Sequence, residues 1–107
     1  MSVKSDPVLV LSTAPAEDAK RIAKNLVESR LAACVNVTAV QSFYRWEGQF
    51  CEDEESLMII KTVSGRVDPL IARIRELHPY ELPEMIVIPI TGGNPPYLDW
   101  LRSETVI

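Results

Sequence analysis

The side chains best suited to chemistry gather around one histidine. His78, the only histidine of the chain, is followed by Glu81 and Glu84 within residues 78–84. An imidazole with nearby carboxylates suits a borderline divalent metal such as Cu(II) or Zn(II). A histidine at the end of a helix also interacts favourably with the last helical carbonyl groups. A purely structural role for His78 is therefore the alternative interpretation.

The two cysteines stand in different settings. Cys34 lies among small and branched apolar residues, where a free thiol usually packs as a small hydrophobic side chain. The alternative for Cys34 is a role as a metal ligand together with His78 and Glu81. Cys51 precedes the acidic residues 52–55, which predict a solvated hairpin end or, with the thiol, a metal site. No CxxC pair occurs, so a structural zinc site is excluded, and a disulfide is not expected in a reducing compartment.

Catalysis is not favoured by these residues. A nucleophilic Cys or Ser needs a base within reach, and His78 is the one histidine available. Glu81 and Glu84 flank a proline in a predicted loop without a substrate-pocket signature, and no glycine-rich phosphate motif is present. We therefore expect a protein that is not an enzyme. A hydrolase or redox enzyme that uses Cys34 is an alternative.

Size and charge exclude several classes of protein. The chain has 107 residues, 47% hydrophobic and 24% charged, which predicts a single globular domain spanning 1–107. The net charge is −4 and no basic cluster exceeds residues 20–21, so nucleic acid is not an expected partner. No apolar stretch approaches the roughly 20 residues of a membrane span, and residues 1–7 lack a signal-peptide pattern. We expect a cytoplasmic protein with no membrane partner.

The hydrophobic pattern predicts strands and helices in a definite order. The predicted strands span residues 7–13, 33–46, 55–62 and 85–90, with a turn at Gly48 and a bulge near residues 41–42 as a further expectation. The predicted helices span residues 15–30 and 67–77, and a short last helix follows Asn94. The second helix must end before Pro79.

The resulting βαββαβ order is the ferredoxin-like α+β arrangement, followed by a C-terminal helix. Right-handed crossovers place both main helices on one face of a four-stranded antiparallel sheet and leave the other face uncovered. The strand at 33–46 is about 14 residues long, whereas strands usually have 5–6. Because an apolar face and unpaired strand edges favour aggregation of a monomer, the pattern predicts a closed homo-oligomer.

Five segments together resemble the CutA divalent-cation-tolerance family. They read LAACVN at 31–36, YRWEG at 44–48, IKT at 60–62, HPYELPE at 78–84 and YLDW at 97–100, and they follow the family's order between residues 8 and 101. The resemblance implies a ferredoxin-like subunit, a homotrimer with extended intersubunit sheets and a PII-like architecture. It also implies a role in the response to divalent metal ions, chiefly copper. A PII-like small-molecule sensor or assembly module is the alternative function.

The resemblance also points to a copper site that this chain has largely lost. Family members with such a site have a cysteine just before Thr-Ala-Pro and two adjacent histidines before Pro-Tyr. Here Ser12 and Leu77 occupy two of these positions, and only His78 is retained. One imidazole and a neutral hydroxyl make a poor ligand set for copper. We therefore expect no obligatory cofactor and only weak binding of Cu(II) or another divalent metal.

Ligand sites in clefts between subunits are a further implication of the resemblance. The polar and aromatic members of the shared segments include Lys61, Tyr80, Glu84, Trp46 and Trp100. A cleft lined by Lys61, Tyr80 and Trp46 would hold a small anion. The alternative is that these residues lock the trimer, because aromatic anchors and charged pairs are common in interfaces.

Overall fold

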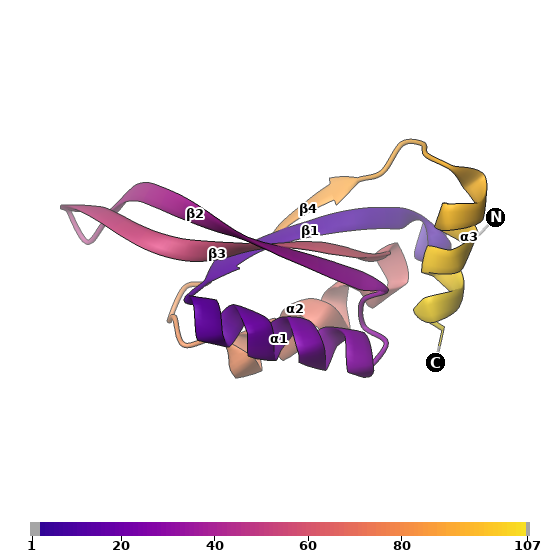
Figure 1. The fold of residues 1–107 in the computed structure, drawn as a ribbon, viewed down its shortest axis with the longest axis horizontal. Coiled ribbons are helices and arrows are strands. Elements are labelled where there is room, and N and C mark those ends of the chain that lie inside the picture. Colours follow the sequence, from indigo (N-terminus) through magenta and orange to yellow (C-terminus); the bar gives the residue numbers. More distant parts are fainter. Residues whose placement is uncertain (1–2, 107) are drawn as a thin grey trace.

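The computed structural model describes residues 3–106. Its four strands form one antiparallel sheet with the order β2-β3-β1-β4 (Figure 1). Met1, Ser2 and Ile107 lie outside the described residues, and so does part of the segment used above to argue against a signal peptide. The strands are β1 (Pro7–Ala14), β2 (Cys34–Trp46), β3 (Gln49–Val63) and β4 (Ile86–Pro89). The helices are α1 (Ala16–Glu28), α2 (Val67–Leu77) and α3 (Pro95–Glu104), with short 3-10 turns η1 (Val3–Ser5) and η2 (Ser64–Arg66). The predicted α+β class is confirmed.

Helix α1 forms because its apolar residues recur on one face. Ala19, Ile22 and Leu26 are fully buried, and Glu17 and Asp18 lie in the first turn, where carboxylates interact favourably with the helix dipole. Helix α2 buries Leu70 and Ile74 in the same way. It ends at His78, whose extended backbone is the conformation favoured before a proline.

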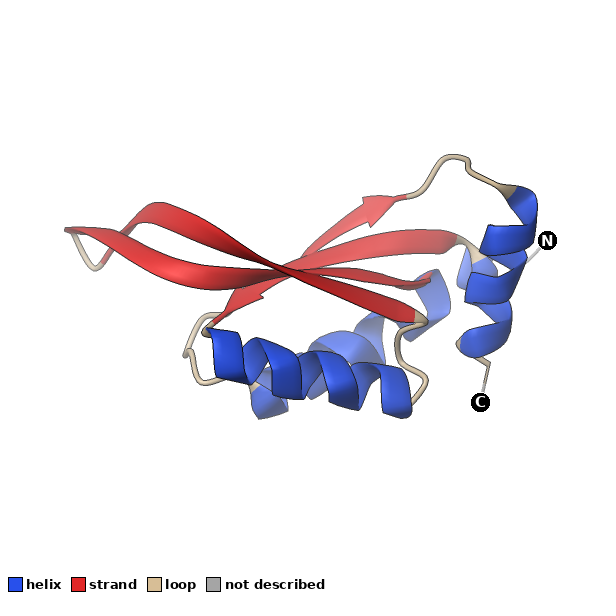
Figure 2. Cartoon of the chain, viewed as in Figure 1, coloured by secondary structure: helices blue, strands red, loops and turns tan. Residues whose placement is uncertain are grey.

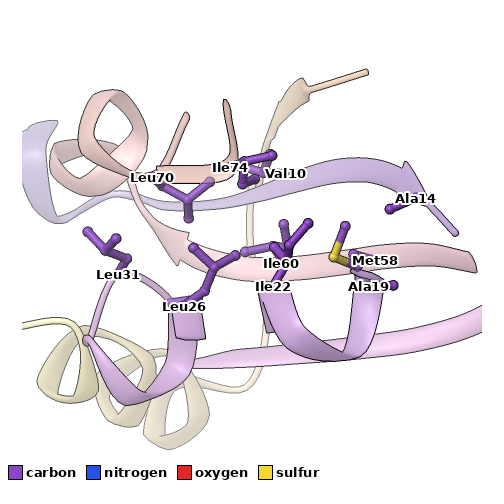
Figure 3. Close-up of a cluster of buried hydrophobic side chains, with 11 residues drawn as sticks. Val10, Ala14, Ala19, Ile22, Leu26, Leu31, Met58, Ile60, Leu70 and Ile74 are labelled. Carbon is purple, nitrogen blue, oxygen red and sulfur yellow. The ribbon is translucent and has the colours of Figure 1, made fainter. Parts of the chain in front are cut away.

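The core lies between one face of the sheet and helices α1 and α2. Val10 of β1 and Met58 and Ile60 of β3 point toward these helices and are fully buried (Figure 3). Ser12 and Thr62 project to the same side, because side chains alternate along a strand and Ser12 pairs with Met58. We call this side the covered face. Burial of each large aliphatic side chain stabilises the fold by roughly 1.5–3 kcal/mol.

The other side of the sheet has no helix layer of this kind, and we call it the uncovered face. Its apolar residues are Leu9, Leu11, Leu57, Ile59, Ile86 and Ile88. The first four are half-buried, while Ile86 and Ile88 are 50% and 38% exposed. Helix α3 packs at one end of the sheet (Figure 2). Its Leu101 forms a buried cluster with Val63 and Ala33. The predicted placement of the two main helices on one face is confirmed.

The β2–β3 hairpin corrects two predictions. β3 begins at Gln49 rather than residue 55, so the acidic residues 52–55 lie within a paired strand and not at a hairpin end. The pairing runs without interruption from Cys34–Lys61 to Trp46–Gln49, so the expected bulge near residues 41–42 is absent. The reason is the two-residue turn at Glu47 and Gly48, whose positive φ angles of 50° and 78° fit a tight hairpin and fix a regular register.

The hairpin extends well past the helices. We call residues 40–55 the arm, which forms the free end of the β2–β3 ribbon in Figure 2. The chain measures 46 × 25 × 21 Å, and its radius of gyration of 14.4 Å exceeds the roughly 13 Å of a compact domain of this length. Phe43 and Phe50 stack across the arm with ring centroids 6.5 Å apart and remain largely exposed. The arm therefore leaves apolar surface in water.

Candidate functional site

His78 is held in place by two hydrogen bonds. It is 8% exposed, its Nε2 lies 2.7 Å from the carbonyl oxygen of Thr13, and its Nδ1 accepts a 3.1 Å bond from the backbone N–H of Tyr80. Only the neutral tautomer with its proton on Nε2 makes both bonds. A metal ion has no free ring lone pair to use in this arrangement. His78 links the end of β1 to the segment that follows α2.

The residues at the other two copper-ligand positions of the family also point away from a metal role. Ser12 is fully buried on the covered face, and its Oγ has no hydrogen-bond partner among the residues that the structure describes. Leu77 is partly buried and packs against the core. Within residues 3–106, no three His, Cys, Asp or Glu side chains come together as a metal site. The described residues therefore do not provide a preformed copper centre.

Cys34 lies in a cationic setting. It pairs with Lys61 across β2 and β3, and Lys61 Nζ is 4.0 Å from its Sγ and 2.5 Å from Asn36 Oδ1. The thiol is half-buried and free, as is Cys51, whose Sγ lies 3.8 Å from the carbonyl oxygen of Gln49. The described polar partners of Cys34 include the ammonium group of Lys61, whose positive charge disfavours a bound cation.

A pocket of about 320 Å³ opens between the arm and the segment that follows α2. The arm strand β2 contributes Tyr44 and Trp46, which share one face of the strand because they are two residues apart. The rest of the wall is formed by consecutive residues, namely Pro79, Tyr80, Glu81 and Leu82. Such a volume is at the lower end for small-molecule sites. We call this concavity the aromatic pocket.

Two carboxylates of β3 hold the tyrosines of the aromatic pocket. The Tyr80 hydroxyl donates a 2.8 Å hydrogen bond to Oε2 of Glu55, which is 9% exposed. Burial, reinforced by this bond, raises the pKa of Tyr80 above its ordinary value. The Tyr44 hydroxyl donates to Asp53, and this hydrogen bond is the main cause that raises the pKa of Tyr44 to about 12. Both phenols are therefore held neutral, with their rings fixed.

The residues that the sequence predicted to line one cleft lie in different places in the structure. Trp46 and Tyr80 line the aromatic pocket together with Glu81, whereas Lys61 is directed to Asn36 on the sheet. Trp100 belongs to α3 and contacts Tyr97 there, with ring centroids 5.4 Å apart. Glu84 is exposed in the loop before β4 and does not line the pocket.

Sequence reasoning missed three members of this site. Tyr44 was not selected as a site residue. Asp53 and Glu55 were considered only within the acidic run, which was interpreted as a hairpin end or a metal site with Cys51. The alternation of Tyr44 and Trp46 along β2 was a usable signal. Their carboxylate partners required the register of the hairpin, which the incorrect start of β3 concealed.

The fold and this site define a class: an antiparallel α+β subunit with an overlong hairpin, seen also in a solved structure named PII-like protein CutA from Nostoc sp. That structure is 39% identical, has a TM-score of 0.89, and the match covers 92% of this chain and 97% of the other. The family model described as CutA1 divalent ion tolerance protein matches residues 8–104. The chain therefore belongs to the CutA divalent-cation-tolerance family.

Relatives from distant organisms support this membership. The divalent-cation tolerance protein CutA of Thermus thermophilus is 50% identical over 99 residues, which cover 91% of this chain and 96% of the relative. Its solved structure superposes with a TM-score of 0.90 over 94% of this chain and 99% of that chain. Protein CutA of Mus musculus is 50% identical over 88 residues, covering 81% of this chain. The chain spans only about half the length of the mouse protein, 50%.

Proposed function

We propose that this chain contributes to divalent-cation tolerance as a homotrimer assembled through the uncovered face and the outer strand edges of the sheet. Family membership supports the role in tolerance. The observation that carries the assembly is the uncovered face, where Ile86 and Ile88 are 50% and 38% exposed beside the half-buried Leu9 and Leu11. A contiguous apolar surface of this kind marks an association site.

The strand edges support the same assembly. β2 and β4 are the outer strands of the sheet, so one edge of each has backbone N–H and C=O groups that pair with no other strand of this sheet. Pairing of the long β2 edge of one copy with the β4 edge of the next would join different surfaces, and such a contact forms a ring when the rotation between copies closes. A ring of three copies also encloses the uncovered faces.

Metal contact within this proposal is weak and centres on His78, with Glu81 as an assisting carboxylate. Glu81 is exposed and follows His78 by three residues. A Cu(II) ion on Nδ1 of His78 would have to displace the N–H of Tyr80, which makes the bound state unfavourable relative to a preformed site. Cys34, set beside Lys61, is proposed only as a remote third donor.

Light scattering combined with a Cu(II) titration tests the assembly and the metal site together. We expect a mass three times the 12.0 kDa of one chain. Calorimetry should show weak Cu(II) binding that is lost in His78→Gln, whose amide retains a donor for Thr13 and an acceptor for Tyr80. A stable single chain at micromolar concentration contradicts the trimer. Equal Cu(II) binding by both proteins contradicts the role of His78.

A second candidate function is a small-molecule sensor or assembly module that acts through clefts of the assembly. The aromatic pocket favours it, because its walls come from two separate segments that a ligand would join. Thermal-shift screening with nucleotides, metabolites and organic ions distinguishes this function, since a ligand at 100 times its dissociation constant stabilises by roughly 2.7 kcal/mol. No shift with any class of compound contradicts it.

A cytoplasmic location and the absence of catalysis complete the proposal. Both cysteines are free thiols, which is consistent with a reducing compartment. Relatives have been named periplasmic in Archaeoglobus fulgidus and chloroplastic in Arabidopsis thaliana, so cell fractionation is the deciding measurement. Among residues 3–106, no helix has the length and apolar character to cross a membrane. Rapid reaction of Cys34 with a thiol reagent near neutral pH would favour the enzyme alternative.

A further inference from the structure

We infer that the aromatic pocket binds a small organic ammonium ion. This inference rests on the second candidate function and gives it a ligand class. The ligand is a cation, whereas the sequence predicted a small anion in a cleft that included Lys61. Three aromatic side chains, Tyr44, Trp46 and Tyr80, form the wall. The face of an aromatic ring carries negative potential and attracts a cation placed over it, most strongly for tryptophan.

The charged groups that line the pocket or bond its tyrosines are all carboxylates. Glu81 is the one charged residue among the lining residues, and the two tyrosines are bonded to carboxylates, Asp53 and Glu55. Arg45 lies between Tyr44 and Trp46 in sequence, but alternation along β2 directs it to the opposite face of the strand. An anionic ligand would meet only carboxylates here, whereas a cation is attracted by all of them.

The hydrogen bonds also prepare the rings for a cation. A phenol whose hydroxyl donates a hydrogen bond to a carboxylate is polarised toward greater electron density on its oxygen and ring. Tyr80 is further fixed by its backbone bond to His78, and the two rings lie 4.7 Å apart. Because the ring positions are set before binding, less conformational freedom is lost when a ligand enters.

The size of the pocket limits the ligand. A volume of about 320 Å³ accommodates a compact head group rather than a nucleotide or a peptide. Leu82 and Pro79 add apolar surface beside the aromatic rings. A trimethylammonium group matches this lining, since its charge is spread over methyl groups that contact apolar and aromatic surface equally well.

Choline and its uncharged isostere 3,3-dimethyl-1-butanol are the probes that test the inference. The chain contains two tryptophans, so in Trp100→Phe the fluorescence reports on Trp46 alone. We expect a saturable fluorescence change with choline, affinity at least about tenfold weaker for the isostere, and weakening of choline binding by added salt. Equal affinity for both probes, or no saturation with choline up to millimolar concentration, overturns the inference.

Matched variants separate the pocket from the rest of the surface. Trp46→Leu, which lacks the reporting tryptophan and is therefore followed by calorimetry, should weaken choline binding by about threefold to tenfold, which is the usual contribution of one ring. Trp100→Leu is the control, because Trp100 is 42% exposed against 40% for Trp46 and lies outside the pocket. Equal weakening in both variants contradicts the site. Glu81→Gln provides a second test on an exposed side chain in case Trp46→Leu does not fold.

The light-scattering mass of each variant distinguishes failure of this inference from failure of the proposed function. A trimer without choline binding overturns the ammonium site and leaves the assembly intact. Choline binding by a single chain supports the pocket, whose lining residues all come from one copy, and contradicts the trimer.

Discussion

Ile59 and Ile60 are neighbours on β3 with identical side chains and opposite surroundings. Ile60 is fully buried beneath α1 and α2, whereas Ile59 is half-buried on the uncovered face. The covered face is therefore sufficient to hold one subunit together. The uncovered face has equally apolar residues but lacks a helix layer, so in the proposed trimer its contribution to stability would come from another copy. Alternate residues of one strand thus supply the subunit core and the proposed assembly surface.

The largest predicted effect separates these two neighbours. Ile60→Asp places a carboxylate without a partner in the core, and the several kcal/mol this costs is comparable with the roughly 5–15 kcal/mol stability of a domain. We expect its circular dichroism to be that of an unfolded chain. Ile59→Asp should instead yield folded subunits with the mass of a single chain, because the charge disrupts only the association of uncovered faces.

The controls for this pair are Ile60→Val and Ile59→Val, which keep both faces apolar and should remain folded and trimeric. If Ile59→Asp unfolds like Ile60→Asp, the uncovered face belongs to the subunit core and the comparison fails. A trimeric Ile59→Asp would place the interface elsewhere.

A second prediction sharpens the description of the covered face through its two buried hydroxyl groups. Ser12 Oγ has no partner, while Thr62 Oγ1 donates a 2.7 Å hydrogen bond to the carbonyl oxygen of Leu31. Ser12→Ala should therefore raise the free energy of unfolding by about 1 kcal/mol, since an unsatisfied buried group is removed. Thr62→Val should lower it by about 1–3 kcal/mol, since the Leu31 carbonyl loses its donor.

Urea denaturation at one fixed protein concentration measures both changes, because the concentration enters the stability of an oligomer. A destabilised Ser12→Ala would mean that the hydroxyl has a partner, and the account of the Ser12 environment would then be wrong.

The smallest effect concerns the arm, where polar contacts replace the buried core. Tyr44 has a pKa raised from 10.0 to about 12, chiefly by its hydrogen bond to Asp53. A raised pKa in the folded state contributes stability that is present below pH 10 and is lost as the pH rises through about 12. Asp53→Asn should move the Tyr44 titration back toward 10.0, as followed by phenolate absorbance.

Assignment of that titration needs two further variants. Tyr44→Phe removes the signal of Tyr44 from the three tyrosines of the chain. Glu52→Gln is the matched control, because Glu52 bonds Gln41 and not a tyrosine. A titration that shifts equally in Asp53→Asn and Glu52→Gln would show general charge rather than the hydrogen bond to be the cause.

Local rules predicted most of the fold. The helical spacing of Ala19, Ile22 and Leu26 identified α1 and its buried face, and Pro79 located the end of α2 within one residue. These signals work because helix periodicity and proline geometry depend on adjacent residues. The start of β3 was predicted six residues too late, because like charges at residues 52–55 suggested solvent. The tight turn at Gly48 and the alternation of side chains along the strand start β3 at Gln49 in spite of these charges.

The candidate site was predicted only in part, and for a physical reason. The sequence by itself marked His78, Tyr80, Glu81 and Trp46 as residues of interest, through their types and the segments they occupy. Only the tertiary structure decided that both nitrogens of His78 are occupied. The partner of Nε2, the carbonyl oxygen of Thr13, lies 65 residues away in sequence, so only the folded chain brings it to His78.

The same division holds for the aromatic pocket. The sequence determined that the chain has an overlong hairpin and more apolar sheet surface than two helices can cover. The tertiary structure decided that Lys61 points to Asn36 and that Tyr44 and Tyr80 bond Asp53 and Glu55. Strand register and the path of the segment after α2 set these pairings. Both are fixed by packing over the whole molecule, because a hydrogen bond forms only where the folded backbone brings donor and acceptor within reach.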